Sequence, residues 1–152
     1  SLARRHVFNQ LGPDPLADDF DPETAIRNLQ ANPDMEIAVA LLKQHVLAGI
    51  GNEFKSEVCF AAGVHPFRKI SSLSEGELRS LLDAARAQLH DNVRQHSPRR
   101  RTTRRIEALE NLWVYNRSGQ PCRKCSEAIQ GLRHAADGRL SFWCPRCQGP
   151  AG

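Results

Sequence analysis

The fold of this 152-residue chain depends on residues 41–57, whose sequence is LLKQHVLAGIGNEFKSE. The segment begins as an apolar helix and then reaches Gly49 and Gly51, two glycines separated by a single apolar residue. Glycine adopts backbone conformations that other residues avoid, so this spacing predicts a tight turn. Asn52 follows directly and is a favourable residue with which to begin a helix. Residues 41–57 therefore predict a helix, a short turn and a second helix.

The same turn has the chemistry of a phosphate site. The start of a helix has unpaired backbone N–H groups and a partial positive charge, and it therefore attracts anions. Gly49 and Gly51 would let a phosphate approach without meeting a Cβ atom. Asn52 can donate its side-chain amide to the same phosphate, and Lys55, one turn further, can add a charge. A plain turn between two helices explains the glycines alone equally well.

Four helices are predicted in the first two thirds of the chain. They begin after Asp21, near Met35, near Asn52 and at Ser74. Asp21 is a suitable N-cap and is followed by a proline, which suits the first helical position. The second helix, over residues 35–46, is apolar on more than one face and is expected to be buried. Gly63 is expected to end the third helix, and Ser74 with Glu77 forms a capping box at the start of the fourth.

Four of the five cysteines form two Cys-x-x-Cys pairs, Cys122 with Cys125 and Cys144 with Cys147, separated by 18 residues. Two such pairs can place four thiolates around one tetrahedral zinc ion, and a full thiolate shell makes the ion structural rather than catalytic. His134 lies between the pairs but is not needed as a ligand. Unligated thiols or two disulfides are the alternative. Metal binding would supply roughly 10–16 kcal/mol of folding free energy to so small a unit.

Two short strands are predicted around the metal site, one ahead of each cysteine pair. Trp113-Val114-Tyr115 and Leu140-Ser141-Phe142-Trp143 have the aromatic and β-branched composition of strands. Arg139 directly precedes the second strand, and a guanidinium on a hairpin offers several donors to phosphate oxygens. By itself, an arginine at this position is as well explained by ordinary solvated surface.

Charge is distributed unevenly along the chain. Residues 1–93 contain 9 Lys and Arg against 13 Asp and Glu, a balance of −4, whereas residues 94–152 contain 12 against 4, a balance of +8. A basic C-terminal third suggests a polyanionic partner, although solubility alone is the alternative explanation. No apolar run approaches the roughly 20 residues of a membrane span, and no signal peptide is evident. We expect a cytoplasmic protein without a membrane partner.

Composition divides the chain into four regions. We expect a linker or severed end over residues 1–19, a helical domain over 20–96, a basic connection rich in arginine over 97–112, and a four-cysteine finger over 113–149.

Five stretches of the chain combine into a specific pattern. They are Leu11-Gly12-Pro13-Asp14-Pro15-Leu16; residues 41–57; Gly63-Val64-His65-Pro66; Val114-Tyr115-x-Arg117-x-Gly119-x-Pro121-Cys122-x-x-Cys125; and Arg139-x-x-x-x-Cys144-Pro145-x-Cys147-Gln148. Together they resemble the C-terminal part of the formamidopyrimidine-DNA glycosylase and endonuclease VIII family, over about residues 9–149. Trp143-Cys144-Pro145 is closer to the endonuclease VIII side. The resemblance implies a mainly α fold, with a helix-two-turn-helix bundle followed by a small β-hairpin zinc finger.

The resemblance also implies roles for single residues. Asn52 would hold a DNA phosphate, and Arg139 would grip the phosphates beside a flipped, damaged nucleotide and assist the second (δ) elimination. The four cysteines would hold one Zn²⁺. The implied partner is duplex DNA containing a damaged base or an abasic site, in a bacterial cytoplasm and in association with the nucleoid.

The catalytic nucleophile of this family is an N-terminal proline followed by glutamate, on a β-sandwich domain. Pro22-Glu23 instead lies at a predicted helix start, so no counterpart exists here. We therefore expect a DNA-binding half of a base-excision-repair glycosylase and abasic-site lyase. This half would bind duplex DNA without cutting it and would depend on the missing catalytic domain. A stand-alone zinc-ribbon regulator or nucleic-acid binder, and a protein–protein adaptor, are the alternatives.

Overall fold

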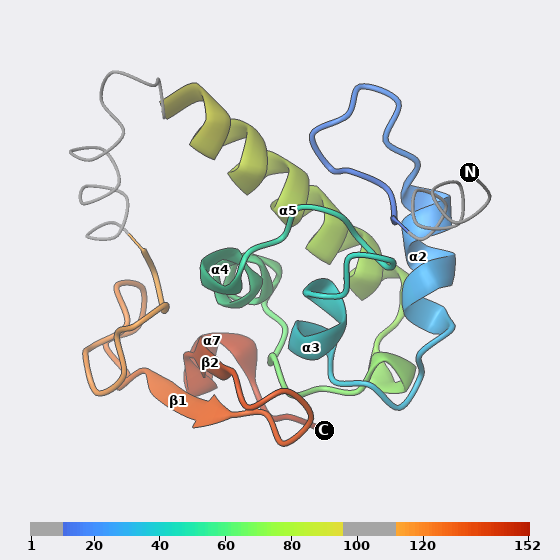
Figure 1. The fold of residues 1–152 in the computed structure, drawn as a ribbon. Helices are drawn as coiled ribbons and strands as arrows, with labels where there is room; N and C mark the ends of the chain where they lie inside the picture. Colours follow the sequence, from blue (N-terminus) through green and yellow to red (C-terminus); the bar gives the residue numbers. More distant parts are fainter. Residues whose placement is uncertain (1–10, 96–111) are drawn as a thin grey trace.

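The structure is a computed structural model that describes residues 11–95 and 112–152 (Figure 1). The described elements are, in chain order, α2 (Pro22–Gln30), α3 (Ile37–Leu41), α4 (Asn52–Ala62), the short 3-10 helix η1 (Ile70–Ser72), α5 (Glu75–Gln95), β1 (Gln130–Arg133), β2 (Leu140–Trp143) and α7 (Pro145–Gln148). A mainly helical region is thus followed by a two-stranded antiparallel hairpin, which confirms the predicted fold class. The predicted basic connection lies outside the described residues except for Leu112.

The predicted helix starts are found at α2 and α5. The Asp21 carboxylate accepts hydrogen bonds from the Glu23 backbone N–H at 3.0 Å and from the Thr24 hydroxyl at 2.6 Å. At the start of α5, the Ser74 hydroxyl accepts from the Glu77 N–H at 3.1 Å, and the Glu77 carboxylate accepts from the Ser74 N–H at 3.0 Å. This reciprocal pair is the predicted capping box.

The second helix, α3, ends at Leu41 rather than near Val46 and is therefore shorter than predicted. All five of its residues are buried, as its apolar composition predicted. Beyond Leu41 the backbone continues in turns, and the Gln44 carbonyl accepts a hydrogen bond from the Gly12 N–H at 2.7 Å. The segment that precedes α2 thus forms a hydrogen bond with the backbone near the predicted end of the second helix.

The described part of the segment expected to be a linker or severed end, residues 11–19, makes contacts with the helical region. The Pro13 carbonyl accepts from the Ala48 N–H at 3.0 Å, and the Arg86 guanidinium on α5 donates to the Pro15 carbonyl at 3.1 Å. A Cβ atom on Gly12 would lie 2.5 Å from the Val46 carbonyl carbon and oxygen. Only glycine fits at this crossing without a shift of backbone.

Helix α4 lies between the other helices and the finger (Figure 1). One side of it, which includes Val58 and Cys59, belongs to the main helical core with α2, α3 and α5. Phe60 instead belongs to a second, smaller core with Val114, Ile129 and Phe142 of the finger. One helix therefore supplies apolar side chains to both cores. Within the described parts of the chain, no helix is long and apolar enough to cross a membrane.

We predict that Gly12→Ala lowers the free energy of unfolding by about 2 kcal/mol or more, because the added methyl meets backbone rather than a mobile side chain. Gly76→Ala is the matched control. Gly76 lies in the first turn of α5 with only the Ser74 hydroxyl near its Cβ position, at 3.8 Å, so it should be neutral or stabilising by roughly 0.5 kcal/mol. Urea unfolding followed by circular dichroism measures both, and equal effects would contradict the close crossing at Gly12.

Candidate zinc centre and nucleic-acid interface

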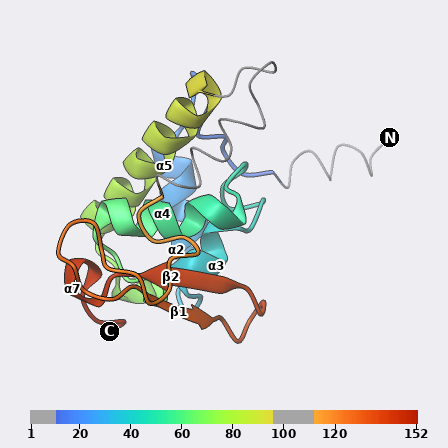
Figure 2. The same ribbon diagram turned by 90° about the vertical axis from the view of Figure 1, so that its left-hand side faces the viewer.

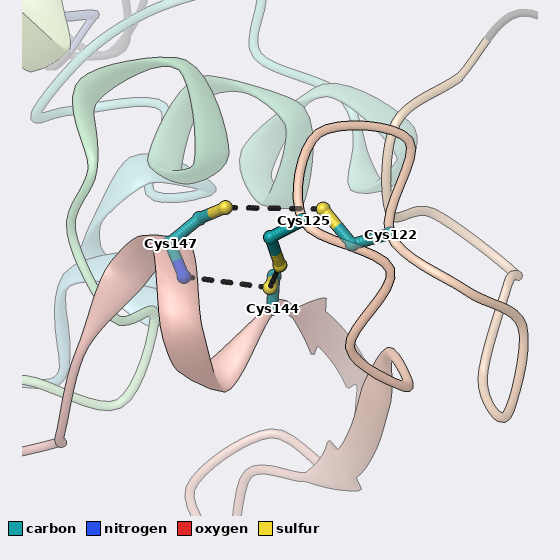
Figure 3. Close-up of side chains that lie close together, drawn as sticks. All are labelled: Cys122, Cys125, Cys144 and Cys147. Atoms are coloured by element: carbon teal, nitrogen blue, oxygen red, sulfur yellow. Dashed lines mark hydrogen bonds between the residues drawn. The ribbon is translucent and has the colours of Figure 1, made fainter.

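The four cysteines of the two Cys-x-x-Cys pairs converge on one point. Their Sγ atoms all lie within 4.8 Å of one another (Figure 3). Cys122 Sγ is 3.8 Å from Cys147 Sγ, and Cys125 Sγ is 3.3 Å from Cys144 Sγ. A tetrahedral site with Zn–S distances of roughly 2.3 Å requires sulfur atoms about 3.8 Å apart. The donor set therefore fits one structural zinc ion and does not support two disulfides.

The local electrostatics of the thiols also favour a cation. Burial raises the pKa of Cys122, but hydrogen bonds from the backbone N–H groups of Lys124 and Cys125 and from the thiols of Cys144 and Cys125 together more than offset this, and the pKa falls to about 7. Burial and the neighbouring thiols raise the pKa of Cys147 to about 12. Several thiolates in so small a space repel one another, and a bound divalent cation removes that repulsion.

Two polar side chains of α4 hold the finger in place. Glu57 is buried, and its carboxylate accepts hydrogen bonds from three successive backbone N–H groups: Trp113 at 2.6 Å, Val114 at 2.9 Å and Tyr115 at 3.1 Å. The neighbouring Ser56 hydroxyl accepts from the Phe142 N–H of β2 at 3.1 Å. Neither residue is identified as a contact by the sequence, since nothing in a helical pattern indicates a partner so distant in the chain.

The strand predicted at residues 113–115 is wrong, because the partner of these residues, Glu57, is also distant in the chain. These residues form a bend whose N–H groups point at the Glu57 carboxylate instead of a neighbouring strand. The partner of β2 is β1, which sequence analysis did not identify, and Gly131 lies opposite Phe142. The strand predicted at Leu140–Trp143 is confirmed as β2.

His134 joins the finger to the helical region rather than binding metal. Its ring is fully buried and lies between the Glu36 carboxylate, 2.9 Å from Nδ1, and the Ser141 hydroxyl, 2.6 Å from Nε2. The ring also stacks on Phe67, with centroids 3.8 Å apart. Its two ring nitrogens are therefore both engaged away from the cysteine cluster.

The start of α4 has the predicted glycine turn, with one correction. Gly49 has a φ of +88°, a conformation that favours glycine, and no heavy atom other than Asp14 Oδ1, at 4.0 Å, approaches its Cβ position. Gly51 rather than Asn52 is the N-cap, and Asn52 is the first helical residue. The Asn52 side chain forms no capping bond, and its Oδ1 atom is buried without a partner. The amide is therefore not committed to its own helix.

Arg139 lies at the end of the turn between β1 and β2, and its side chain is exposed. The Asp137 carboxylate accepts from the Arg139 N–H at 3.0 Å, and the Arg139 carbonyl accepts from the His134 N–H at 3.0 Å, so the backbone at Arg139 is fixed by the turn. Lys55, which was predicted to add a charge to the site, is fully buried.

The start of α4 and the finger turn lie close together. Burial lowers the pKa of Lys55, and both Asp137 and Arg139 are near enough to shift it, Asp137 upward and Arg139 downward. In Figure 2 the β1–β2 turn projects toward the same side of the molecule as the start of α4. The finger turn and the start of α4, far apart in sequence, thus lie on one side of the molecule.

Two families match separate parts of the chain. Residues 11–103 match the family described as the formamidopyrimidine-DNA glycosylase H2TH domain, where H2TH denotes helix-two-turn-helix. Residues 119–149 match the family described as the zinc finger found in FPG and IleRS.

Similar proteins and structures cover nearly the whole chain. Endonuclease 8 2 of Mycobacterium bovis is 45% identical over 142 residues, which are 93% of this chain and 53% of that protein. The DNA-(apurinic or apyrimidinic site) lyase Nei2 of Mycolicibacterium smegmatis is 41% identical, over 91% of this chain and 52% of that protein. A crystal structure of the Lactococcus lactis FPG with DNA containing FAPY-dG has a TM-score of 0.82 and 28% identity, and it covers 98% of this chain and 55% of that one. The chain therefore spans about half the length of the relatives that it matches.

We predict that Cys144→Ser abolishes stoichiometric zinc binding and unfolds the finger, because one of the four thiolates is lost. Both tryptophans, Trp113 and Trp143, belong to the finger region, so their fluorescence should change, while the far-ultraviolet signal of the helices should largely persist. A chelator should have the same effect on the unmodified chain, and added zinc should reverse it.

The matched control for this experiment is Cys59→Ser. Cys59 is fully buried within α4 and lies outside the cluster, so this variant should retain one zinc per chain by atomic absorption. Full zinc content in Cys144→Ser would contradict the four-thiolate site.

Proposed function

The chain belongs to the formamidopyrimidine-DNA glycosylase and endonuclease VIII family, and from this premise we propose that it grips damaged duplex DNA through backbone phosphates. It corresponds to the C-terminal DNA-binding region of these enzymes, with the helix-two-turn-helix domain and the zinc finger. Contacts to phosphates would fix the register of the duplex without reading its sequence.

One observation carries the proposal: the start of an 11-residue helix and the finger turn that ends at the exposed Arg139 lie on the same side of the molecule (Figure 2). No atom lies within 4 Å of the Cβ position on Gly51, only Asp14 Oδ1 approaches that on Gly49, at 4.0 Å, and Asn52 begins α4 with an uncommitted amide oxygen. A phosphate there would meet backbone N–H groups and the positive end of the helix dipole. Arg139 would donate to the same phosphate or to an adjacent one.

The relatives' names supply the activity that we propose for the whole protein. They include an abasic-site lyase and formamidopyrimidine-DNA glycosylases, and similar crystal structures contain FAPY-dG or abasic-site DNA. We infer that the complete enzyme removes oxidised bases and cleaves at abasic sites in the bacterial nucleoid. The nucleophile would lie in the share of the relatives' length that this chain does not cover, and Arg139 would assist the second elimination.

We predict that Arg139→Ala weakens binding to abasic-site duplex roughly tenfold, because one charge-assisted phosphate contact is lost. The loss should be similar for different sequences, since a phosphate carries no base information. Fluorescence anisotropy at several salt concentrations measures both effects. If three phosphates are neutralised, the slope of log K against log salt should be about −2.7. In the variant the magnitude of this slope should decrease by about 0.9, because one phosphate contact is lost.

Arg133→Ala provides a matched control on the same hairpin. Arg133 is exposed and donates to the Gly138 carbonyl at 2.8 Å, so this variant removes the same charge from the other end of the turn. A loss of affinity in Arg133→Ala equal to that in Arg139→Ala would indicate general electrostatics rather than a contact at Arg139. An unchanged affinity in Arg139→Ala would exclude its phosphate role.

We also predict that this chain alone binds abasic-site DNA but does not cleave it. A covalent complex trapped with borohydride would report a Schiff base with an amine of the enzyme, and it should form only with the complete protein. A strand-cleaving activity that co-elutes with the purified chain would contradict the prediction that this chain binds DNA without cleaving it.

A further inference from the structure

Lys55 forms no ion pair with any of the residues that the structure describes. Its side chain is fully buried in α4, and Nζ has no hydrogen-bond partner. Lysine normally extends its charged end to water even when its aliphatic part is covered. An unpaired buried ammonium is costly, so a protein that retains one gives up stability at that position.

Asn52 also has a buried polar atom without a hydrogen-bond partner, and it lies on the same side of the helix as Lys55. Asn52 and Lys55 are three residues apart, and side chains at that spacing lie on one face of a helix. Helical side chains lean toward the N-terminus, so Lys55 covers the first turn of α4. Of the three buried side-chain atoms without a partner among the described residues, two are Asn52 Oδ1 and Lys55 Nζ. Unsatisfied polar atoms concentrated in one place indicate a ligand that arrives from outside.

The finger contributes charge to the same place but does not pair with Lys55. Burial lowers the pKa of Lys55 below its ordinary value of 10.5, and Arg139 lowers it further, whereas Asp137 and Cys59 raise it. The Asp137 carboxylate accepts the backbone N–H of Arg139 and forms no ion pair with Lys55 Nζ. Lys55 Nζ therefore has Arg139 and Asp137 near it but forms a hydrogen bond or an ion pair with neither.

We propose that Lys55 is a binding residue of the phosphate site at the start of α4, left unpaired in the free protein and given its counter-charge by a DNA phosphate. This inference rests on the proposed function and adds to it a residue that acts from beneath the exposed groups. The phosphate oxygen would accept from Nζ at the base of the site, while Asn52 and Arg139 contact it nearer the surface. Rotation of the Asn52 amide exchanges Oδ1 for Nδ2 and completes a set of donors.

Removal of the Lys55 charge should therefore raise the stability of the protein and lower its affinity for DNA. Lys55→Met keeps most of the side-chain length and eliminates the ammonium. It should raise the urea midpoint, because a buried unpaired charge is gone. It should also weaken DNA binding about tenfold and reduce the magnitude of the salt slope by about 0.9, because one phosphate contact is lost. A residue that only fills the core would lose stability together with affinity.

The pH dependence gives a second measurement that needs no variant. A phosphate beside Lys55 raises its pKa, so binding takes up protons wherever the free residue is partly deprotonated, and affinity falls as pH rises through that range. In the free protein the unfolded state binds this proton more tightly, so stability should rise with pH in the window that ends at 10.5. Calorimetric titration of abasic-site duplex in two buffers with different ionisation enthalpies measures the proton uptake directly.

The matched control is Arg27→Met, which removes one exposed charge on α2, a helix remote from the finger (Figure 1). It should leave affinity and proton uptake unchanged. Lys55→Met with the affinity, salt slope and proton uptake of the unmodified chain would overturn this inference, while leaving the Arg139 contact intact. Failure of the unmodified chain to bind duplex would instead remove the proposed function itself.

Discussion

The arrangement of this protein depends on a single buried carboxylate, that of Glu57. It lies in the helix that both cores share, and it accepts three consecutive backbone N–H groups from the segment that leads into the finger. Hydrogen bonds to a charged acceptor are stronger than those between neutral groups, and removal of the acceptor would leave three donors unsatisfied. Together with the Ser56–Phe142 hydrogen bond and the contact between His134 and Glu36, these bonds fix how the finger meets the helical region.

The zinc site and the docking of the finger depend on each other. The smaller core contains only a few buried side chains, one of which, Phe60, comes from α4. Such a core cannot hold a hairpin and two knuckles by itself, so a metal ion must supply much of the folding free energy. The cysteine cluster holds α7 and β2 together, and Gln148 on α7 donates to the Val64 carbonyl beside the end of α4, at 2.8 Å. Metal binding at one end of the finger thus stabilises the same contact that positions Arg139 at the other.

The proposed phosphate site lies where the structure is least satisfied internally. The helix start is open above Gly51, the Asn52 amide is uncommitted, and Lys55 is buried without a partner. Elsewhere polar side chains at the same interface are fully engaged, as at His134 and Glu57. Proteins commonly sacrifice some stability at a functional site so that a ligand finds donors already in place. The unpartnered atoms of Asn52 and Lys55 thus distinguish the proposed phosphate site from the contact between the finger and the helices, where His134 and Glu57 are hydrogen-bonded.

The sequence alone determined the local features, because their causes are local. Spacing of the cysteines specified the metal site, Asp21 and Ser74 specified helix starts, and Gly49 specified a turn with positive φ. It failed where a distant partner decides the outcome. α3 ends early because Gly12 and Pro13 bind the backbone beyond it, and residues 113–115 bend because their N–H groups meet Glu57. Only the tertiary structure could bring the finger turn and the start of α4 to the same side of the molecule and bury Lys55, since burial and proximity are properties of neighbours in space, which a linear pattern does not contain.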